Sequence, residues 1–128
     1  NLGADTNTSN LKNNYSFVKN WDYSKDSMQN TGSQYCGLIM GDYSKCGINT
    51  MFNTGTVVGV SASIFGGGFP SKFIPSYSWG GSDGFVDYEL EKAIELADVV
   101  MKRRGIEFSL ADKQILEHVF NSTTVYRK

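Results

Sequence analysis

Three consecutive basic residues, Lys102, Arg103 and Arg104, form one group of side chains whose type and spacing could do chemistry. Clustered cationic side chains attract phosphate groups, such as those of a nucleotide. The same residues follow a predicted helix, however, and positive charge in the last turn of a helix compensates its dipole. Dipole compensation is the simpler interpretation of this run, and phosphate binding is the alternative.

Other residue types that catalyse reactions or bind metals are few. The two cysteines, Cys36 and Cys46, are too few for a disulfide framework or a zinc site. Cys46 occupies an apolar position of the repeat described below, which favours a small buried hydrophobic role. The single histidine, His118, lies beside the apolar stripe of a predicted helix and suggests a surface or packing role. We therefore expect no catalytic residue and no metal ligand in this chain.

Bulk composition excludes several classes of function. The chain has 128 residues, enough for one domain with a modest core, and its formal net charge is −1. That charge gives no argument for nucleic-acid binding, and no apolar run is long enough to span a bilayer. The first residues, which lack an initiator methionine, show no signal-peptide pattern. We expect a cytoplasmic piece of a larger protein that lacks its upstream sequence.

A six-residue repeat is the main pattern of the sequence. Large or apolar residues recur six positions apart at Met40, Cys46, Phe52, Val58 and Ile64. Each of the first four is followed four positions later by a small residue, namely Ser44, Thr50, Thr56 and Ala62. Neither the helical period of about 3.6 residues nor the strand period of 2 explains this spacing alone.

Short strands joined by turns explain a period of six, because each hexad can form one flat side and one corner of a coil. The large residues would then stack inside the coil, with the small residues near its corners. The residues after the anchors, Gly41, Gly47, Asn53 and Gly59, would adopt the positive φ of tight corners. The sequence therefore predicts a mainly β fold, a parallel β-helix of hexapeptide repeats; an alternating strand run in an ordinary sheet is the alternative.

The remaining regions complete the predicted domain organisation. Residues 1–68 form a partial β-helix, with a hairpin or excursion loop near residues 12–35. Residues 69–86, rich in aromatic residues, glycine and proline, are a linker that packs on neighbouring structure. Residues 87–128 form two helices, the first ending at Gly105 and the second capped by Ser109.

Two stretches carry a resemblance to a known family. They are "NLGADTNTSNLKNN" at the start of the chain and "MGDYSKCGINTMFNTGTVVGVSASIFGGG" within the repeat. Together they resemble the C-terminal left-handed β-helix domain of the GlmU-like bifunctional enzyme that makes UDP-N-acetylglucosamine. The C-terminal helices are more similar to a divergent, glucose-1-phosphate thymidylyltransferase-like branch. The left hand of the predicted β-helix comes from this resemblance alone.

The resemblance implies an activity and a set of site residues. It implies a homotrimer that transfers an acetyl group from acetyl-CoA to an amino-sugar phosphate, with Mg²⁺ used only in an absent nucleotidyltransferase half. By position, Asn1 matches a residue that contacts the sugar phosphate. Ala4, Asn10 and Gly66 match positions at the coenzyme. Acyl transfer to an amine needs a base and a donor for the thioester oxygen, and the amide of Asn10 could be that donor.

Two functions remain open at this point. In the first, the chain is a piece of a nucleotidyltransferase/acyltransferase, which Asn1, Ala4 and Asn10 favour. In the second, it is a non-catalytic module that trimerises or regulates a sugar-1-phosphate nucleotidyltransferase. Leu11 and Ile48 favour the second function, because the family has tyrosine and serine at these positions.

Overall fold

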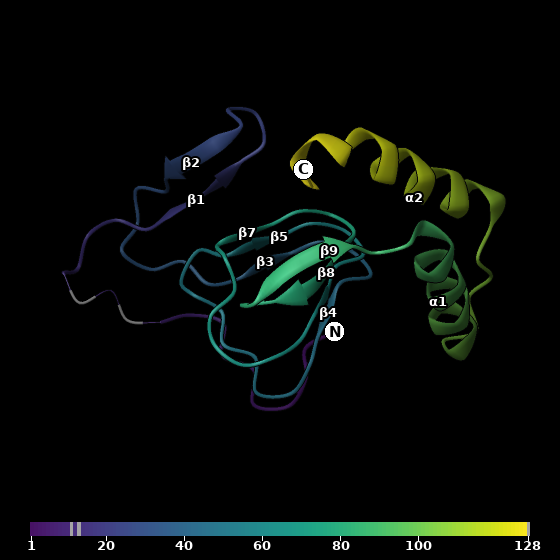
Figure 1. Ribbon diagram of the computed structural model, residues 1–128, viewed down its shortest axis with the longest axis horizontal. Coiled ribbons are helices and arrows are strands. Elements are labelled where there is room, and N and C mark those ends of the chain that lie inside the picture. Colours follow the sequence, from purple (N-terminus) through teal and green to yellow (C-terminus); the bar gives the residue numbers. More distant parts are fainter. Residues whose placement is uncertain (11, 13, 128) are drawn as a thin grey trace.

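The computed structural model describes residues 1–10, 12 and 14–127, which form short strands and two α-helices (Figure 1). Leu11 lies outside the described residues. The strands are β1 (Lys19–Asp22), β2 (Ser27–Asn30), β3 (Ile39–Met40), β4 (Lys45–Cys46), β5 (Val57–Val58), β6 (Ser63–Ile64), β7 (Phe73–Ile74), β8 (Ser78–Gly81) and β9 (Gly84–Asp87). The helices are α1 (Leu90–Arg103), α2 (Leu110–Ser122) and the 3₁₀ helix η1 (Thr124–Arg127).

The strands form three small sheets. β1 and β2 make an antiparallel hairpin, which confirms the hairpin expected near residues 12–35. β3, β5 and β7 pair in parallel in that order. β4, β6 and β8 also pair in parallel, but β9 pairs antiparallel with β8, so the four-stranded sheet is mixed.

The predicted fold class, a left-handed parallel β-helix of hexapeptide repeats, is wrong. The strands belong to separate sheets of two, three and four strands, and two of these sheets contain antiparallel pairs. The repeat is also not sustained: Ile39 pairs with Val57, whereas the step from Val57 to its partner Phe73 is two residues shorter. The interval 69–86, expected as a linker, contains β7, β8 and the first residues of β9. The predicted pair of C-terminal helices is present.

The six-spaced residues nevertheless share one core. Cys46, Phe52, Val58 and Ile64 are buried together with Ala62 and Ile74, and Met40 packs against this cluster. The four small residues Ser44, Thr50, Thr56 and Ala62 are buried as well. The hydroxyls among them accept or donate hydrogen bonds at the turns: Ser44 Oγ donates to the Gly59 carbonyl at 2.6 Å. Small polar residues are therefore required here because they pair carbonyl groups that water does not reach.

Glycine is needed in the repeat for a different reason from the predicted one. The non-glycine positive φ angles of the repeat fall at Tyr43 (62°), Asn49 (58°) and Ser61 (54°), not directly after the anchors. Gly59 instead lies against the next chain segment, because a Cβ atom there would be 2.4 Å from the backbone nitrogen of Ser76. Close approach of backbone to backbone, rather than a left-handed turn, excludes a side chain at this position.

Substitution of Gly59 by alanine is therefore expected to destabilise the protein by about 1–3 kcal/mol or more, the usual cost of overpacking. The new methyl group would overlap backbone atoms of Ser76, which cannot rotate away. Gly67→Ala is the matched control, since nothing lies within 4 Å of its Cβ position. Urea denaturation of both variants measures the difference, and an equal stability for the two would contradict the packing argument.

The first C-terminal helix ends, and the second begins, where the sequence indicates. α1 is followed by Gly105, whose φ is +70°. α2 starts at a capping box: the Ser109 hydroxyl accepts from the Asp112 amide, and the Asp112 carboxylate accepts from the Ser109 amide. The Asp112 carboxylate accepts hydrogen bonds from both the amide and the hydroxyl of Ser109, and these two bonds lower the pKa of Asp112 because they favour its charged form. No helix among the described residues has the length and apolar character needed to cross a membrane.

Tyr77 and Arg127 fasten α2 to the sheets. Tyr77 is fully buried, its hydroxyl donates to the Leu116 carbonyl at 2.8 Å, and its ring meets Phe120 edge to face. The Arg127 guanidinium, with only 3% of its side chain exposed, donates to the carbonyls of Ser76 and Phe120 and forms an ion pair with Asp87. The last turn of the chain thus bridges α2, the β7–β8 connection and β9.

The hairpin is joined to the same end of the molecule through aromatic rings. Trp21 stacks on Phe73 with ring centroids 4.1 Å apart, and Tyr126 of η1 meets Trp21 edge to face. The Tyr126 hydroxyl also donates to Asp26 at 2.6 Å. Phe73 belongs to the aromatic stretch that the sequence predicted to pack on neighbouring structure, and it does so here.

Candidate functional site

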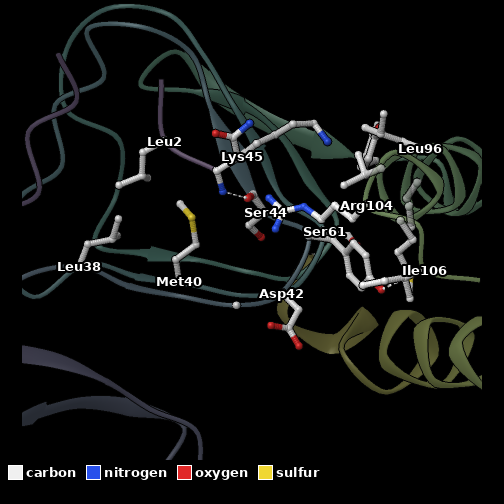
Figure 2. A pocket seen from close by; sticks show the side chains of 18 of the residues that line it. Leu2, Leu38, Met40, Asp42, Ser44, Lys45, Ser61, Leu96, Arg104 and Ile106 are labelled. Atoms are coloured by element: carbon white, nitrogen blue, oxygen red, sulfur yellow. Dashed lines mark hydrogen bonds between the residues drawn. The ribbon is translucent and has the colours of Figure 1, made fainter. Parts of the chain in front are cut away.

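A cavity of about 1010 Å³ lies between the segment around β3 and β4 and the inner face of α1. We call it the α1 cavity (Figure 2). The wall contributed by α1 is apolar apart from the C-cap residue Arg104, and Met40 and Leu38 face it from the sheet side. The α1 residues in that wall are Ala93, Leu96, Ala97, Val100 and Met101. The helix presents them together because they follow the 3.6-residue period of one helix face.

Lys45 brings a positive charge into this apolar surrounding. It lies on β4 directly before the core residue Cys46, so its side chain points to the opposite side of the strand. Its Nζ lies 5.9 Å from the centroid of the Tyr88 ring. Among the described residues Lys45 has no hydrogen bond or ion pair from its amine. Burial lowers the pKa of Lys45, because a half-buried ammonium loses hydration without gaining a counter-ion.

Arg104 brings a second positive charge from the other side. It is the C-cap residue of α1 and lines the cavity, whereas its neighbours Lys102 and Arg103 do not. Figure 2 shows Lys45 running from the strand toward the helix and Arg104 running from the helix toward Ser44. Two cations from facing elements therefore reach into one space with apolar walls.

The rim of the cavity carries an acid and a phenol. Asp42 also lines the cavity and is exposed. Its negative charge partly offsets the positive charges of Lys45 and Arg104. The Tyr43 hydroxyl donates to the Met101 sulfur at 3.1 Å and ties the turn before β4 to α1. Burial, followed by the charges of Asp112 and Asp42, raises the pKa of Tyr43, so this phenol stays protonated at neutral pH. The rim is thus held together by Tyr43, and the charged groups that line the cavity are Asp42, Lys45, Arg104 and the amino group of Asn1.

The four site residues expected from the sequence do not come together. Asn1 lines the α1 cavity, and its amino group donates to the Ser44 carbonyl at 2.9 Å. Ala4 is exposed, and its carbonyl accepts from the Asn49 amide. Gly66 is exposed, with a φ of +97° and no atom within 4 Å of its Cβ position. Of the three, only Asn1 lies at a cavity wall.

Asn10, the fourth residue, lines a smaller cavity of about 450 Å³ with Lys12, Tyr15, Tyr35 and Cys36. Its backbone forms hydrogen bonds with the Thr54 hydroxyl in both directions. Asn10 therefore lies in a different hollow of the molecule from Asn1. The two residues are not arranged around one substrate in this structure.

Sequence reasoning missed Lys45 and Tyr88 and assigned Arg104 chiefly to the helix dipole. A signal for Lys45 was present: among the residues that directly precede the five anchors, it is the only charged one. Charged side chains are rarely buried, so a lone charge in this series indicates that the side chain faces away from the core. No comparable signal marks Tyr88, whose place depends on how β9 leads into α1.

Comparison with known proteins gives no relative: no protein family, curated protein or solved structure matches the chain. Among the described residues, no group of three or more histidine, cysteine, aspartate and glutamate side chains is placed to hold a metal ion.

Proposed function

We propose that the chain binds an acyl-coenzyme A thioester in the α1 cavity, with acetyl-CoA as the first ligand to test. In this proposal, binding serves acyl transfer to an amino-sugar phosphate, the reaction that the family resemblance implies. One observation carries the proposal: Lys45 and Arg104 extend from facing elements into a cavity whose α1 wall is otherwise apolar.

The shape and chemistry of the cavity suit such a ligand. A volume of about 1010 Å³ accommodates a long molecule, and ligand sites are mostly apolar with a few placed polar groups. The apolar α1 wall matches the uncharged arm that joins the thioester to the nucleotide. The guanidinium of Arg104 matches phosphate, which it can bind through two parallel hydrogen bonds.

Calorimetric titration of the chain with acetyl-CoA tests this proposal. We expect saturable binding that weakens as salt rises, and about tenfold or greater weakening in Arg104→Ala, because a hydrogen bond to a charged group contributes about 1.5–3 kcal/mol. Arg103→Ala is the matched control, since this neighbouring arginine does not line the cavity. Absence of binding at millimolar acetyl-CoA, or equal weakening in both variants, would contradict the proposal.

A second candidate, a non-catalytic module that holds copies of the chain together, is favoured by an apolar patch on the mixed sheet. Phe65 and Trp79 lie with ring centroids 4.5 Å apart and are 40% and 45% exposed. Val86, 63% exposed, is the cross-strand partner of Trp79. Adjacent exposed apolar side chains of this kind often mark protein interfaces.

If copies associate through this patch, the wild-type protein is expected to sediment as an oligomer, a homotrimer if the family resemblance holds. Trp79→Ser should then shift it to the monomer, because it removes the largest side chain of the patch. Val99→Ser, on the outer face of α1 and 54% exposed, is the control that should leave the mass unchanged. A wild-type monomer at high concentration would contradict this candidate.

A further inference from the structure

The Lys45 amine lines the α1 cavity and is a potential nucleophile as well as a cation. We propose that Lys45 is a self-acylation site, whose amine attacks the thioester carbonyl of acetyl-CoA held in the α1 cavity. This inference rests on the proposed function and adds a covalent modification that regulates the same site.

The position of Lys45 supports attack on a bound thioester. Its side chain runs along the cavity toward α1, while Arg104 reaches in from the far side (Figure 2). A ligand whose phosphates pair with Arg104 would extend its apolar arm along the helix wall, and Lys45 lies within that same space. Holding two reacting groups in one site raises their effective concentration greatly, by orders of magnitude when the geometry is favourable.

The surroundings of Lys45 also favour a nucleophilic amine. No carboxylate of the described residues pairs with its Nζ, and Tyr88 covers one side with an aromatic ring. The charged groups that line the cavity with it are Asp42, Arg104 and the amino group of Asn1. The lowered pKa of Lys45, caused by burial, raises the fraction of unprotonated amine at neutral pH.

The chemical step needs no further reactant. The Nζ lone pair adds to the thioester carbon, a C–N bond forms, and the C–S bond breaks. Coenzyme A leaves as the thiolate and takes up the proton that the nitrogen loses, so the products are acetyl-lysine and free coenzyme A with no change in oxidation state. The modified side chain is uncharged and longer, which removes one cation from the cavity and occupies part of its volume. Acetylation of Lys45 should therefore weaken the binding of the next acetyl-CoA molecule.

Site-resolved mass spectrometry of the chain incubated with acetyl-CoA tests this inference. We expect Lys45 to be acetylated about tenfold or more faster than Lys72, because only Lys45 shares a cavity with the bound thioester. Lys72 is a matched internal control, since burial also lowers its pKa but it lies outside the α1 cavity. Arg104→Ala should remove most of the preference, and Arg103→Ala should retain it. The Lys72 amine donates to the Lys19 carbonyl at 2.6 Å, so the two amines can differ in intrinsic reactivity. Acetic anhydride, which needs no binding site, measures that difference, and the preference for Lys45 with acetyl-CoA should exceed the preference with acetic anhydride by about tenfold.

Titration with coenzyme A, which carries no acyl group, measures binding separately from chemistry. Binding of coenzyme A together with equal acetylation of Lys45 and Lys72 would overturn self-acylation and leave the proposed function standing. Failure of both coenzyme A and acetyl-CoA to bind would overturn the proposed function and the inference with it. In Lys45→Arg, which keeps the positive charge but lacks the reactive amine, the affinity for coenzyme A should be the same before and after treatment with acetyl-CoA, whereas that of the wild type should fall.

Discussion

Replacement of Phe52 by alanine is expected to lower the free energy of unfolding by about 3–5 kcal/mol, the usual cost of removing a buried aromatic side chain. Phe52 has no exposed surface and packs in the core cluster with Cys46, Val58 and Ile64. The cavity left behind would be closed by sheets on several sides, so the structure could not collapse to fill it. Denaturant unfolding monitored by circular dichroism measures the loss.

The control for Phe52 is Phe69→Ala, which removes the same ring from a position that is 42% exposed. This change is expected to alter stability by less than about 1 kcal/mol, because the ring packs less completely. If the Phe52 variant lost no more stability than the Phe69 variant, the result would contradict the inference that the six-spaced residues share one core.

Tyr77→Ala is the second change with a large expected effect, again about 3–5 kcal/mol. It removes a fully buried ring, its edge-to-face contact with Phe120 and the hydrogen bond to the Leu116 carbonyl. These contacts join α2 to the sheets, so we expect amide protons of α2 to lose more exchange protection than those of α1. Hydrogen exchange followed by mass spectrometry resolves the two helices.

Two further variants separate the parts of the Tyr77 contact. Tyr77→Phe keeps the ring and removes the hydroxyl, which should cost about 1–3 kcal/mol because the Leu116 carbonyl loses a buried partner. Tyr35→Ala, at a tyrosine that is 83% exposed, should change little. Uniform loss of protection across both helices in Tyr77→Ala would show that Tyr77 stabilises the whole chain rather than the attachment of α2.

The sequence predicted the core better than the sheets. The six-residue spacing identified residues that are buried together, because burial depends on which side chains can point inward at each turn. The spacing did not identify the fold class. Strands of only two residues carry little local information, so long-range packing determines which strands pair. The return of β9 against β8 depends on Gly80, where a Cβ atom would lie 2.1 Å from the Gly84 carbonyl oxygen, and no repeat contains this information.

The helices were predictable because their signals are local. The apolar face of α1, Gly105 after it and the Ser109–Asp112 capping box lie within a few residues of the features that they determine. The buried face of α2 is less regular: Leu116 is buried, but the neighbouring apolar residue Ile115 is 62% exposed. The turn of α2 that contains Leu116 packs on the sheets with one side only. Adjacent apolar residues on this turn therefore differ in burial.

The candidate site was the least predictable part. The α1 cavity combines residues from β4, the β9–α1 junction and the end of α1, and only tertiary packing brings these segments together. Arg104 was recognised as a possible phosphate contact, whereas no role was predicted for Lys45. The resemblance suggested Asn1, Ala4, Asn10 and Gly66, of which the structure places only Asn1 at this cavity.

Amide chemical-shift mapping during titration with acetyl-CoA tests the central claim most directly, because it locates the ligand residue by residue. The account predicts saturable shifts at Lys45, Tyr88, Ala97 and Arg104, which together surround the α1 cavity. Shifts centred on Asn10 or Gly66 with Lys45 and Arg104 unchanged, or no shifts at millimolar acetyl-CoA, would contradict it.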